Sequence, residues 1–360
     1  MFSIKDNLDK LKRVDHQFFI GALGILFIVI ALWAPFGLKT TDLYEGWDNL
    51  RRVEGSYSMV FRPSSSRPLV FLVWKMASLI TTESFMGARL ILAALFWGKA
   101  ILLFSILRKM RLASTSLAFL VAILFIFHPA DQANFLMRAL PRHFSVFAWL
   151  LATLLMVLSC QKSSWLSIPG MATALGVSAL VSEQGFPLMF LTPLALLLCK
   201  ECSVVKKKII AISWYIVFFA CVACYVRNTF LEASYQSTVY VKGQQESIVQ
   251  FLVEIINSNL LAYRRLFGDI WLTTFTEFIH DLRSQQVLYI FYAFLLTLII
   301  GFFTWVFSWQ NEQDISANTN QYAKVLILSG LAIVGLSFFP YSLTVYRYQA
   351  VRVFYYAAAG

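Results

Sequence analysis

The chain has 360 residues, of which 59% are hydrophobic and only 14% are charged, and its mean hydropathy is +0.68. Soluble domains average roughly 45–50% apolar and about 25% charged residues. This composition therefore excludes an ordinary soluble domain and predicts an all-α polytopic membrane protein. The net charge of +11 comes from short basic clusters between apolar runs, the pattern of cytoplasmic loops, so we expect a lipid bilayer and no nucleic acid as partner.

The N-terminal segment MFSIKDNLDKLKRVDHQ is too polar and acidic for a signal peptide, and no small-residue cleavage site follows the first apolar run. We expect that run, His16 to Phe36, to remain as the first span. The basic N-terminus then lies in the cytoplasm, and the polar stretch Thr40–Arg67 lies on the extracytoplasmic face.

The next apolar run, Pro68–Thr81, has only 14 residues and carries Lys75 in its middle. If it spanned the membrane, the basic cluster Arg108–Arg111 would lie outside, against the charge rule. We therefore predict a helix on the membrane surface, or a re-entrant one.

This assignment gives about nine transmembrane helices in a single domain of residues 1–360, in the plasma (inner) membrane with the N-terminus cytoplasmic. After the first span they are Met86–Leu107, Leu117–Phe127, Phe144–Cys160, Leu166–Val181, Phe186–Cys199, Ile209–Val226, Val287–Trp309 and Val325–Val345. Residues 37–85 form the first extracytoplasmic loop and residues 227–286 a long one. The chain ends in VFYYAAAG with no polar tail, which is compatible with a truncated C-terminus.

Two segments of the long outer loop have helical apolar spacing. Ser247–Leu261 places Glu254 on its polar face, and Leu266–Phe278 contains Trp271 and Phe275. Both are expected to be amphipathic helices on the outer face. Packing over the ends of the spans is favoured over a catalytic role.

Three acids follow the first span at positions i, i+3 and i+6: Asp42, Glu45 and Asp48. On a helix, neighbouring acids of this set share a face, so two carboxylates can converge on one ligand. They suit a general base or a divalent metal site, with Mg or Mn held by Asp42 and Asp48. The alternative is a solvated loop whose acids pair with Arg51, Arg52 and Arg62.

The second outer loop contributes Asp131, Arg138, Arg142 and His143 at the same face. Arginine suits phosphate because its planar fork offers paired donors. The alternative is a solvated turn between two spans.

Three further charged residues lie near the outer ends of spans. Glu183, in Ser-Glu-Gln-Gly-Phe-Pro, is costly near the bilayer without a partner, and an ion pair with an outer arginine is favoured over direct chemistry. Arg347 and Arg352 lie among tyrosines after the last span. They form either an interfacial aromatic belt or a site for a lipid-linked phosphate.

Motifs typical of soluble enzymes are missing: there is no GxxxxGK[ST], GxSxG or HExxH. Cys221 and Cys224 have the CxxC spacing but lie inside an apolar run, which favours packing over metal or redox use. The spans contain few acids, which weakens a transporter interpretation.

The layout of the loops and the stretches TDLYEGWD, RPLVFLVWK and SEQGFPL resemble the GT-C superfamily of integral-membrane glycosyltransferases, in its less-studied bacterial members. The resemblance implies transfer of a sugar from a polyprenyl-phosphate carrier to a glycan, lipid or protein acceptor on the outer face. It implies a catalytic acid among Asp42, Glu45, Asp48 and Asp131. Candidate substrate-binding or phosphate-binding residues are Arg67, Arg138, Arg142, His143, Glu183, Arg347 and Arg352.

One spacing departs from that family, whose first-loop acids are usually adjacent or one residue apart. Here the pattern is D-x-x-E-x-x-D, which leaves the choice of base open and allows an inactive relative. Two rival functions remain: a transporter or flippase of a lipid-linked saccharide, and a non-catalytic membrane scaffold.

Overall fold

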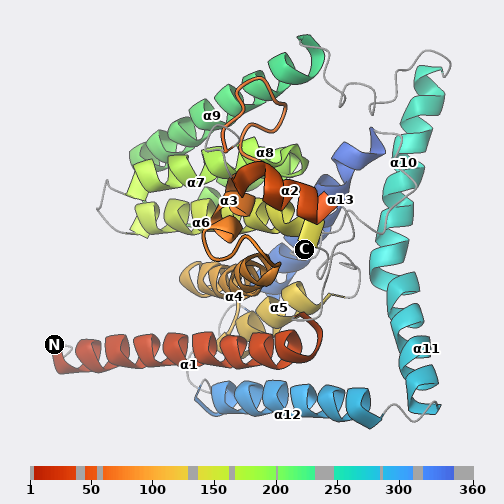
Figure 1. Cartoon of the computed structure of the whole chain (residues 1–360). Coiled ribbons are helices and arrows are strands. Elements are labelled where there is room, and N and C mark those ends of the chain that lie inside the picture. Colours follow the sequence, from red (N-terminus) through yellow and green to blue (C-terminus); the bar gives the residue numbers. More distant parts are fainter. Residues whose placement is uncertain are drawn as a thin grey trace.

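The structure is a computed structural model that describes residues 4–37, 45–54, 60–128, 137–161, 167–199, 202–231, 247–283, 287–310 and 319–343 (Figure 1). Every regular element within these ranges is a helix, so the all-α prediction is confirmed.

The helices of the first half of the chain are α1 (Ile4–Phe36), α2 (Glu45–Glu54), α3 (Leu72–Ser78), α4 (Met86–Lys109), α5 (Thr115–Phe127), the 3-10 helix η3 (Met137–Ala139) and α6 (Leu140–Gln161). Those of the second half are α7 (Ser167–Val181), η4 (Glu183–Gly185), α8 (Phe186–Leu191), η5 (Thr192–Leu198), α9 (Val204–Val226), α10 (Ile248–Arg264), α11 (Ile270–Arg283), α12 (Val287–Gln310) and α13 (Thr319–Ser342). A π-helical turn, Arg227–Leu231, extends α9, and another, Arg265–Asp269, joins α10 to α11.

Five of the described helices are long and apolar enough to cross a membrane, which makes the chain a multi-pass membrane protein. They are His16–Trp33 in α1, Met86–Lys109, Leu140–Gln161, Val204–Phe230 and Ile290–Ser308 in α12. A sixth span results if Ser167–Val181 and Glu183–Leu198 together cross once, although the two arms are bent by 115°. The number of about nine spans is therefore not confirmed.

The difference comes from helix length and direction, which hydropathy does not report. α5 has 13 residues, and at about 1.5 Å per residue it is shorter than the roughly 30 Å hydrocarbon core. The apolar part of α13 among the described residues, Ile327–Pro340, is also short. The prediction that Pro68–Thr81 does not span is confirmed, because only the 7 residues of α3 are helical there.

The bent arm after α7 is irregular because proline interrupts it twice. Pro187 opens α8 and Pro193 lies in η5, and proline has no N–H to donate to the preceding turn. Trp214 Nε1 donates to Met189 O at 2.7 Å and so replaces the bond that Pro193 cannot make, while Trp149 Nε1 donates to Thr192 Oγ1 at 3.0 Å. These bonds attach the bent arm to α6 and α9.

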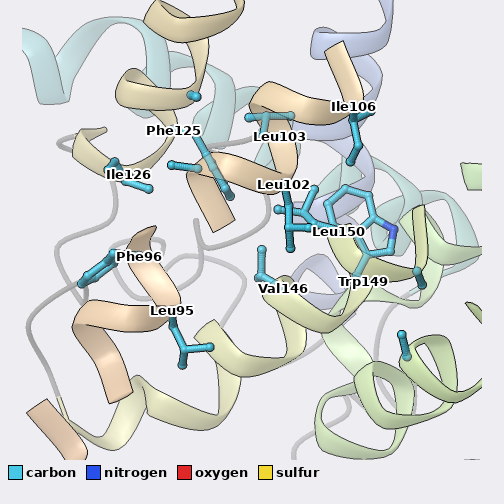
Figure 2. Close-up of a cluster of buried hydrophobic side chains, with 14 of the residues drawn as sticks. Leu95, Phe96, Leu102, Leu103, Ile106, Phe125, Ile126, Val146, Trp149 and Leu150 are labelled. Carbon is cyan, nitrogen blue, oxygen red and sulfur yellow. The ribbon is translucent and has the colours of Figure 1, made fainter. Parts of the chain in front are cut away.

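The centre of the bundle is the contact of α4, α5 and α6. Figure 2 shows Leu102, Leu103 and Ile106 of α4 close to side chains of α6, with α5 beside them; the neighbours are Val146, Trp149, Leu150, Phe125 and Ile126. Between α6 and α7, Ser145 Oγ donates to Ser178 O at 2.9 Å and Ser178 Oγ donates to Ser145 O at 2.7 Å. Small hydroxyl residues of this kind let two membrane helices approach closely while satisfying their polar atoms.

The two ends of the bundle differ in chemistry. At the end that we call the basic end, Arg108 donates to Gln17 Oε1 at 3.1 Å, and Gln161 Nε2 donates to Lys109 O at 2.7 Å. Cys160, near the end of α6, lies close to Cys202, which precedes α9, so the start of α9 with Lys206–Lys208 is at the same end. The opposite end carries α2 and the start of α6, and we call it the polar end.

Helices α10 and α11 form a rod that runs roughly at right angles to α1 and α12 (Figure 1). α10 begins with a capping box, in which Gln250 N donates to Ser247 Oγ and Ser247 N donates to Gln250 Oε1. The two predicted amphipathic helices are therefore present, with boundaries that run further towards the C-terminus than expected.

α3 and α4 approach so closely that only glycine fits at position 87. A Cβ there would collide with the carbonyl oxygen of Ala77 and lie 3.1 Å from the Cβ of Ile80. We expect Gly87→Ala to lower the stability by about 1–3 kcal/mol, because the clash is with backbone and cannot be relieved by a rotamer change. Thermal unfolding in detergent checks this. Gly301→Ala on α12 is the matched control, since no atom outside its own helix lies within 4 Å; equal losses in both variants would contradict the prediction.

The end of α5 contacts α11 through an aromatic pair. The ring of His128 lies edge-on to Trp271, with centroids 5.4 Å apart, and burial lowers the pKa of His128 below its ordinary value of 6.5. The unfolded chain therefore binds this proton more readily, and the free energy of unfolding should fall as the pH drops below 6.5 until the lowered pKa is passed. Thermal unfolding of His128→Phe between pH 7.5 and 5 should show less of this loss than wild type. His280→Phe, on the exposed surface of α11, is the control, and its stability should fall with pH as much as that of wild type.

Candidate functional site

The first-loop segment Arg62–Leu72 folds across the polar end as a compact loop. Arg62 N donates to Pro68 O at 3.0 Å, and Ser65 N donates to Arg62 O at 2.9 Å. Leu69 N donates to Leu180 O at 3.1 Å, which fixes the loop to the last turn of α7. Asn228, at the end of α9, donates through Nδ2 to Pro63 O at 2.6 Å and to Ser65 O at 2.8 Å.

The central contact of this end is the ion pair between Arg67 and Glu183. Arg67 Nε donates to Glu183 Oε2 at 2.6 Å, and its NH2 group donates to Oε1, so the pair is bidentate. The side chains are 27% and 12% exposed. The predicted pairing of Glu183 with an outer arginine is confirmed. Two of the five N–H donors of Arg67 are used in it, which leaves fewer for a phosphate.

Arg142 and His143, in the first turn of α6, have different partners: Arg142 lies near Glu183 and His143 contacts Lys99. Arg142 is half-buried and near enough to Glu183 to favour the ionised carboxylate. His143 is fully buried, and its Nδ1 lies 2.9 Å from Lys99 Nζ. In this position the imidazole faces the interior of the bundle, between α4 and α6.

Lys99 is a site residue that sequence reasoning missed. It is 2% exposed in α4, and its ammonium lies 4.7 Å from the ring centroid of Phe96 and 5.4 Å from that of Phe125. The aromatic faces and the imidazole nitrogen together stabilise the buried charge. The available signal was a lysine inside the predicted span Met86–Leu107, since an ionisable residue within a span marks a candidate functional site.

Lys75 positions the acid-bearing helix α2. It is 8% exposed, and its Nζ donates to Val53 O at 2.7 Å and to Glu54 O at 3.3 Å. A cation at the last carbonyls of a helix is favourable because it complements the helix dipole. α2 also contacts α3 and η3, so it is held close to the start of α6.

Asp48 is the one predicted catalytic acid whose side chain the structure describes. It is exposed on α2, opposite the buried Leu50 and Val53. Among the described contacts it forms no ion pair with Arg51, Arg52 or Arg62, the pairing expected if the acids were only a solvated face. Asp48 is therefore accessible at the polar end.

The remaining predicted residues are only partly placed. Glu45 begins α2 and Arg138 lies in η3, but their side chains are not among those described. Four others, Asp42, Asp131, Arg347 and Arg352, lie outside the described residues. The structure thus brings together Arg67, Arg142 and Glu183, with Asp48 at the same end.

Two buried polar atoms beside Glu183 have no hydrogen-bond partner within the described part of the chain. They are Ser182 Oγ and Gln184 Oε1, in side chains 2% and 5% exposed. Buried polar groups are normally paired, so each such atom calls for an explanation. A hydroxyl-bearing ligand, or water, would satisfy both.

The described residues hold neither a grouping that suits a metal ion nor a disulfide. These contain no group of three or more His, Cys, Asp or Glu side chains placed to hold a metal ion. Among the described residues, Cys221 and Cys224 of α9 form no disulfide, and the same holds for Cys160, Cys199 and Cys202. Of the proposed metal ligands, Asp48 is described and Asp42 is not.

Comparison of the chain with protein-family models, with curated proteins and with solved structures found no match in any of the three. The function is therefore argued from the residues at the polar end.

The ion pair gives a direct test of how this end is held together. Glu183→Gln leaves Arg67 and Arg142 without their shared carboxylate and should cost stability, towards the lower end of about 3–5 kcal/mol because the pair is not fully buried. Arg67→Met should cost less, since Arg142 can still compensate Glu183. Thermal unfolding of both variants and of the double variant Arg67→Met/Glu183→Gln measures the coupling. Additive losses would show that the pair contributes nothing.

Proposed function

We propose that this chain is a membrane glycosyltransferase that moves a sugar from a polyprenyl-phosphate carrier to a hydroxyl of a glycan, lipid or protein on the extracytoplasmic face. The observation that carries the proposal is the position of α2. Lys75 and η3 hold this acid-bearing helix at the end of the bundle where Arg67, Arg142 and Glu183 meet. Acids and guanidinium groups from separate elements are what a displacement at a phosphorylated sugar requires.

The proposed mechanism assigns one role to each kind of group. A carboxylate of the first or second loop, with Asp48 as the described candidate, accepts the proton of the acceptor hydroxyl as it attacks the sugar. Arginine donors, with Arg142 nearest to the described ion pair, stabilise the negative charge on the departing lipid phosphate. Ser182 and Gln184 supply unpaired hydrogen-bonding atoms that suit sugar hydroxyls.

A divalent cation, Mg or Mn, remains part of the proposal only as an alternative use of the acids. Oxygen ligands from Asp42 and Asp48 suit such an ion chemically. The described donors do not form a set of three around one point.

The extracytoplasmic placement follows from charge. Arg108, Lys109 and Lys206–Lys208 gather at the basic end, and cytoplasmic segments of membrane proteins are enriched in such residues. The polar end would then face outwards from the plasma (inner) membrane, with the N-terminus inside.

A second candidate function is transport of a lipid-linked saccharide without covalent chemistry. The buried Lys99–His143 pair favours it, because ionisable groups inside the bundle often belong to substrate or proton pathways.

Single substitutions of the outer acids test the enzyme. In a deletion strain, Asp42→Asn, Glu45→Gln, Asp48→Asn and Asp131→Asn are compared by mass spectrometry of surface glycans, with protein levels measured. We expect one or two of them to abolish addition of a sugar at normal protein level, since a general base contributes about 10²–10⁴-fold. Glu54→Gln, an exposed acid at the far end of α2, is the control and should keep activity.

Purified protein separates the two candidates. Formation of a transfer product from a polyprenyl-phosphate sugar supports the enzyme. Movement of the carrier across liposomes, unaffected by all four acid variants, would replace it with the transporter.

A further inference from the structure

The rod of α10 and α11 has a face that the described part of the chain leaves exposed, apart from the edge contact of Trp271 with His128. Six apolar side chains of α10 are 48–79% exposed: Ile248, Val249, Leu252, Val253, Ile256 and Leu260. Four of α11 are 42–66% exposed: Trp271, Leu272, Phe275 and Phe278. Their helical spacing places them along one side of each helix. We call these ten residues the apolar stripe.

The stripe is distinct from the face that packs on the bundle. Ser258, Ala262 and Leu266 are 0–2% exposed, and the last two pack against Val334 and Phe338 of α13. Tyr263 Oη donates to Leu331 O at 2.6 Å, which fixes the rotation of α10. The rod therefore has one face held by α13, and it presents the stripe elsewhere.

Exposed polar side chains lie along the edge of the stripe. Asn257 and Thr276 are exposed, each next in sequence to a stripe residue, Ile256 and Phe275. Charges of both signs lie along the rod, including an ion pair in which Arg264 Nε donates to Asp269 Oδ1 at 3.2 Å. A helix apolar on one side and charged on the other is suited to a boundary between oil and water.

We propose that the apolar stripe of α10 and α11 is embedded in the lipid surface, so that the rod lies in the plane of the membrane at the polar end. Three observations favour lipid as the occupant. The rod crosses the spans roughly at right angles (Figure 1). It spans 36 residues from 248 to 283, about 54 Å at 1.5 Å per residue and too long and charged to cross the bilayer. α12 begins only four residues after α11 ends, and it is a candidate span of which just 6% is buried.

This continuity also explains the composition of the stripe. The first turns of α12 carry Phe291 and Phe294, which are 58% and 61% exposed. The lipid-facing surface of a span and the stripe then form one apolar surface that turns from the membrane core to its boundary. Trp271 is a residue type enriched at that boundary. The stripe would lie about 5–10 Å deep, where headgroups meet acyl chains.

The embedded stripe is independent of the proposed glycosyltransferase activity, and a first test uses wild-type protein. The full chain is reconstituted into phosphatidylcholine vesicles that contain a phosphatidylcholine with a diazirine in its acyl chain. Illumination generates a carbene that inserts into nearby side chains, and peptide mass spectrometry locates the labels. A parallel sample receives a water-soluble diazirine.

We expect the acyl-chain probe to label Ile256 and Phe275 several-fold more than their neighbours Asn257 and Thr276. Phe302 on α12, 57% exposed, gives the reference for full lipid contact. The water-soluble probe should show the reverse preference within each pair. Labelling of Ile256 and Phe275 by the water-soluble probe alone would overturn the proposal, because the stripe would then face solvent.

Failure of both probes to label the stripe would overturn it too, since a second copy or another protein must then cover it. The matched variants Ile256→Glu and Asn257→Glu give a second measurement in the same vesicles. We expect the first to reduce acyl-chain labelling of neighbouring Leu252 and Leu260 several-fold, and the second to leave it unchanged. Equal labelling in both variants would count against lipid contact.

Discussion

The polar end depends on one ion pair, Arg67–Glu183. A carboxylate with a side chain only 12% exposed is unfavourable unless a cation neutralises it. The two residues are 116 positions apart, so their pairing closes the first loop onto the end of α7. With the loop fixed there, Asn228 can bond to its carbonyls, and α3 with α2 is kept beside the start of α6. The position of the candidate acids thus follows from a contact made elsewhere.

Polar groups inside the bundle are also buried and also need partners, which other residues supply. Ser145 and Ser178 exchange hydrogen bonds between α6 and α7, and two indole N–H groups support the bent arm that follows. Lys99 is the least expected case, because its ammonium group lies 2.9 Å from the imidazole Nδ1 of His143 and close to the rings of Phe96 and Phe125. A bundle with such pairs can hold a few polar groups inside it while its outer surface stays apolar and faces lipid.

The polar end has two parts, and the proposals give them different roles: one binds and activates substrate, and the other contacts lipid. The loop, α2 and the start of α6 gather the charged groups, whereas α10 and α11 present an apolar stripe. A polyprenyl-phosphate carrier likewise combines a charged head, which suits the charged groups, with an apolar tail, which suits the stripe. The proposed enzyme activity depends on the charged groups and the embedded rod on the apolar stripe, so either proposal can be correct without the other.

The sequence alone determined the all-helical membrane class, the long spans of α1, α4, α6, α9 and α12, and the amphipathic character of α10 and α11. These depend on local apolar periodicity and run length, which any stretch of residues carries by itself. It also indicated that Glu183 needs an arginine, because burial of a lone charge is costly wherever it lies. Only the tertiary structure decided that the arginine is Arg67 and that His143 turns inwards to Lys99. It also decided that the chain bends by 115° between α7 and the arm after it. Such choices depend on which distant side chains meet, and that is fixed by packing rather than by any single segment.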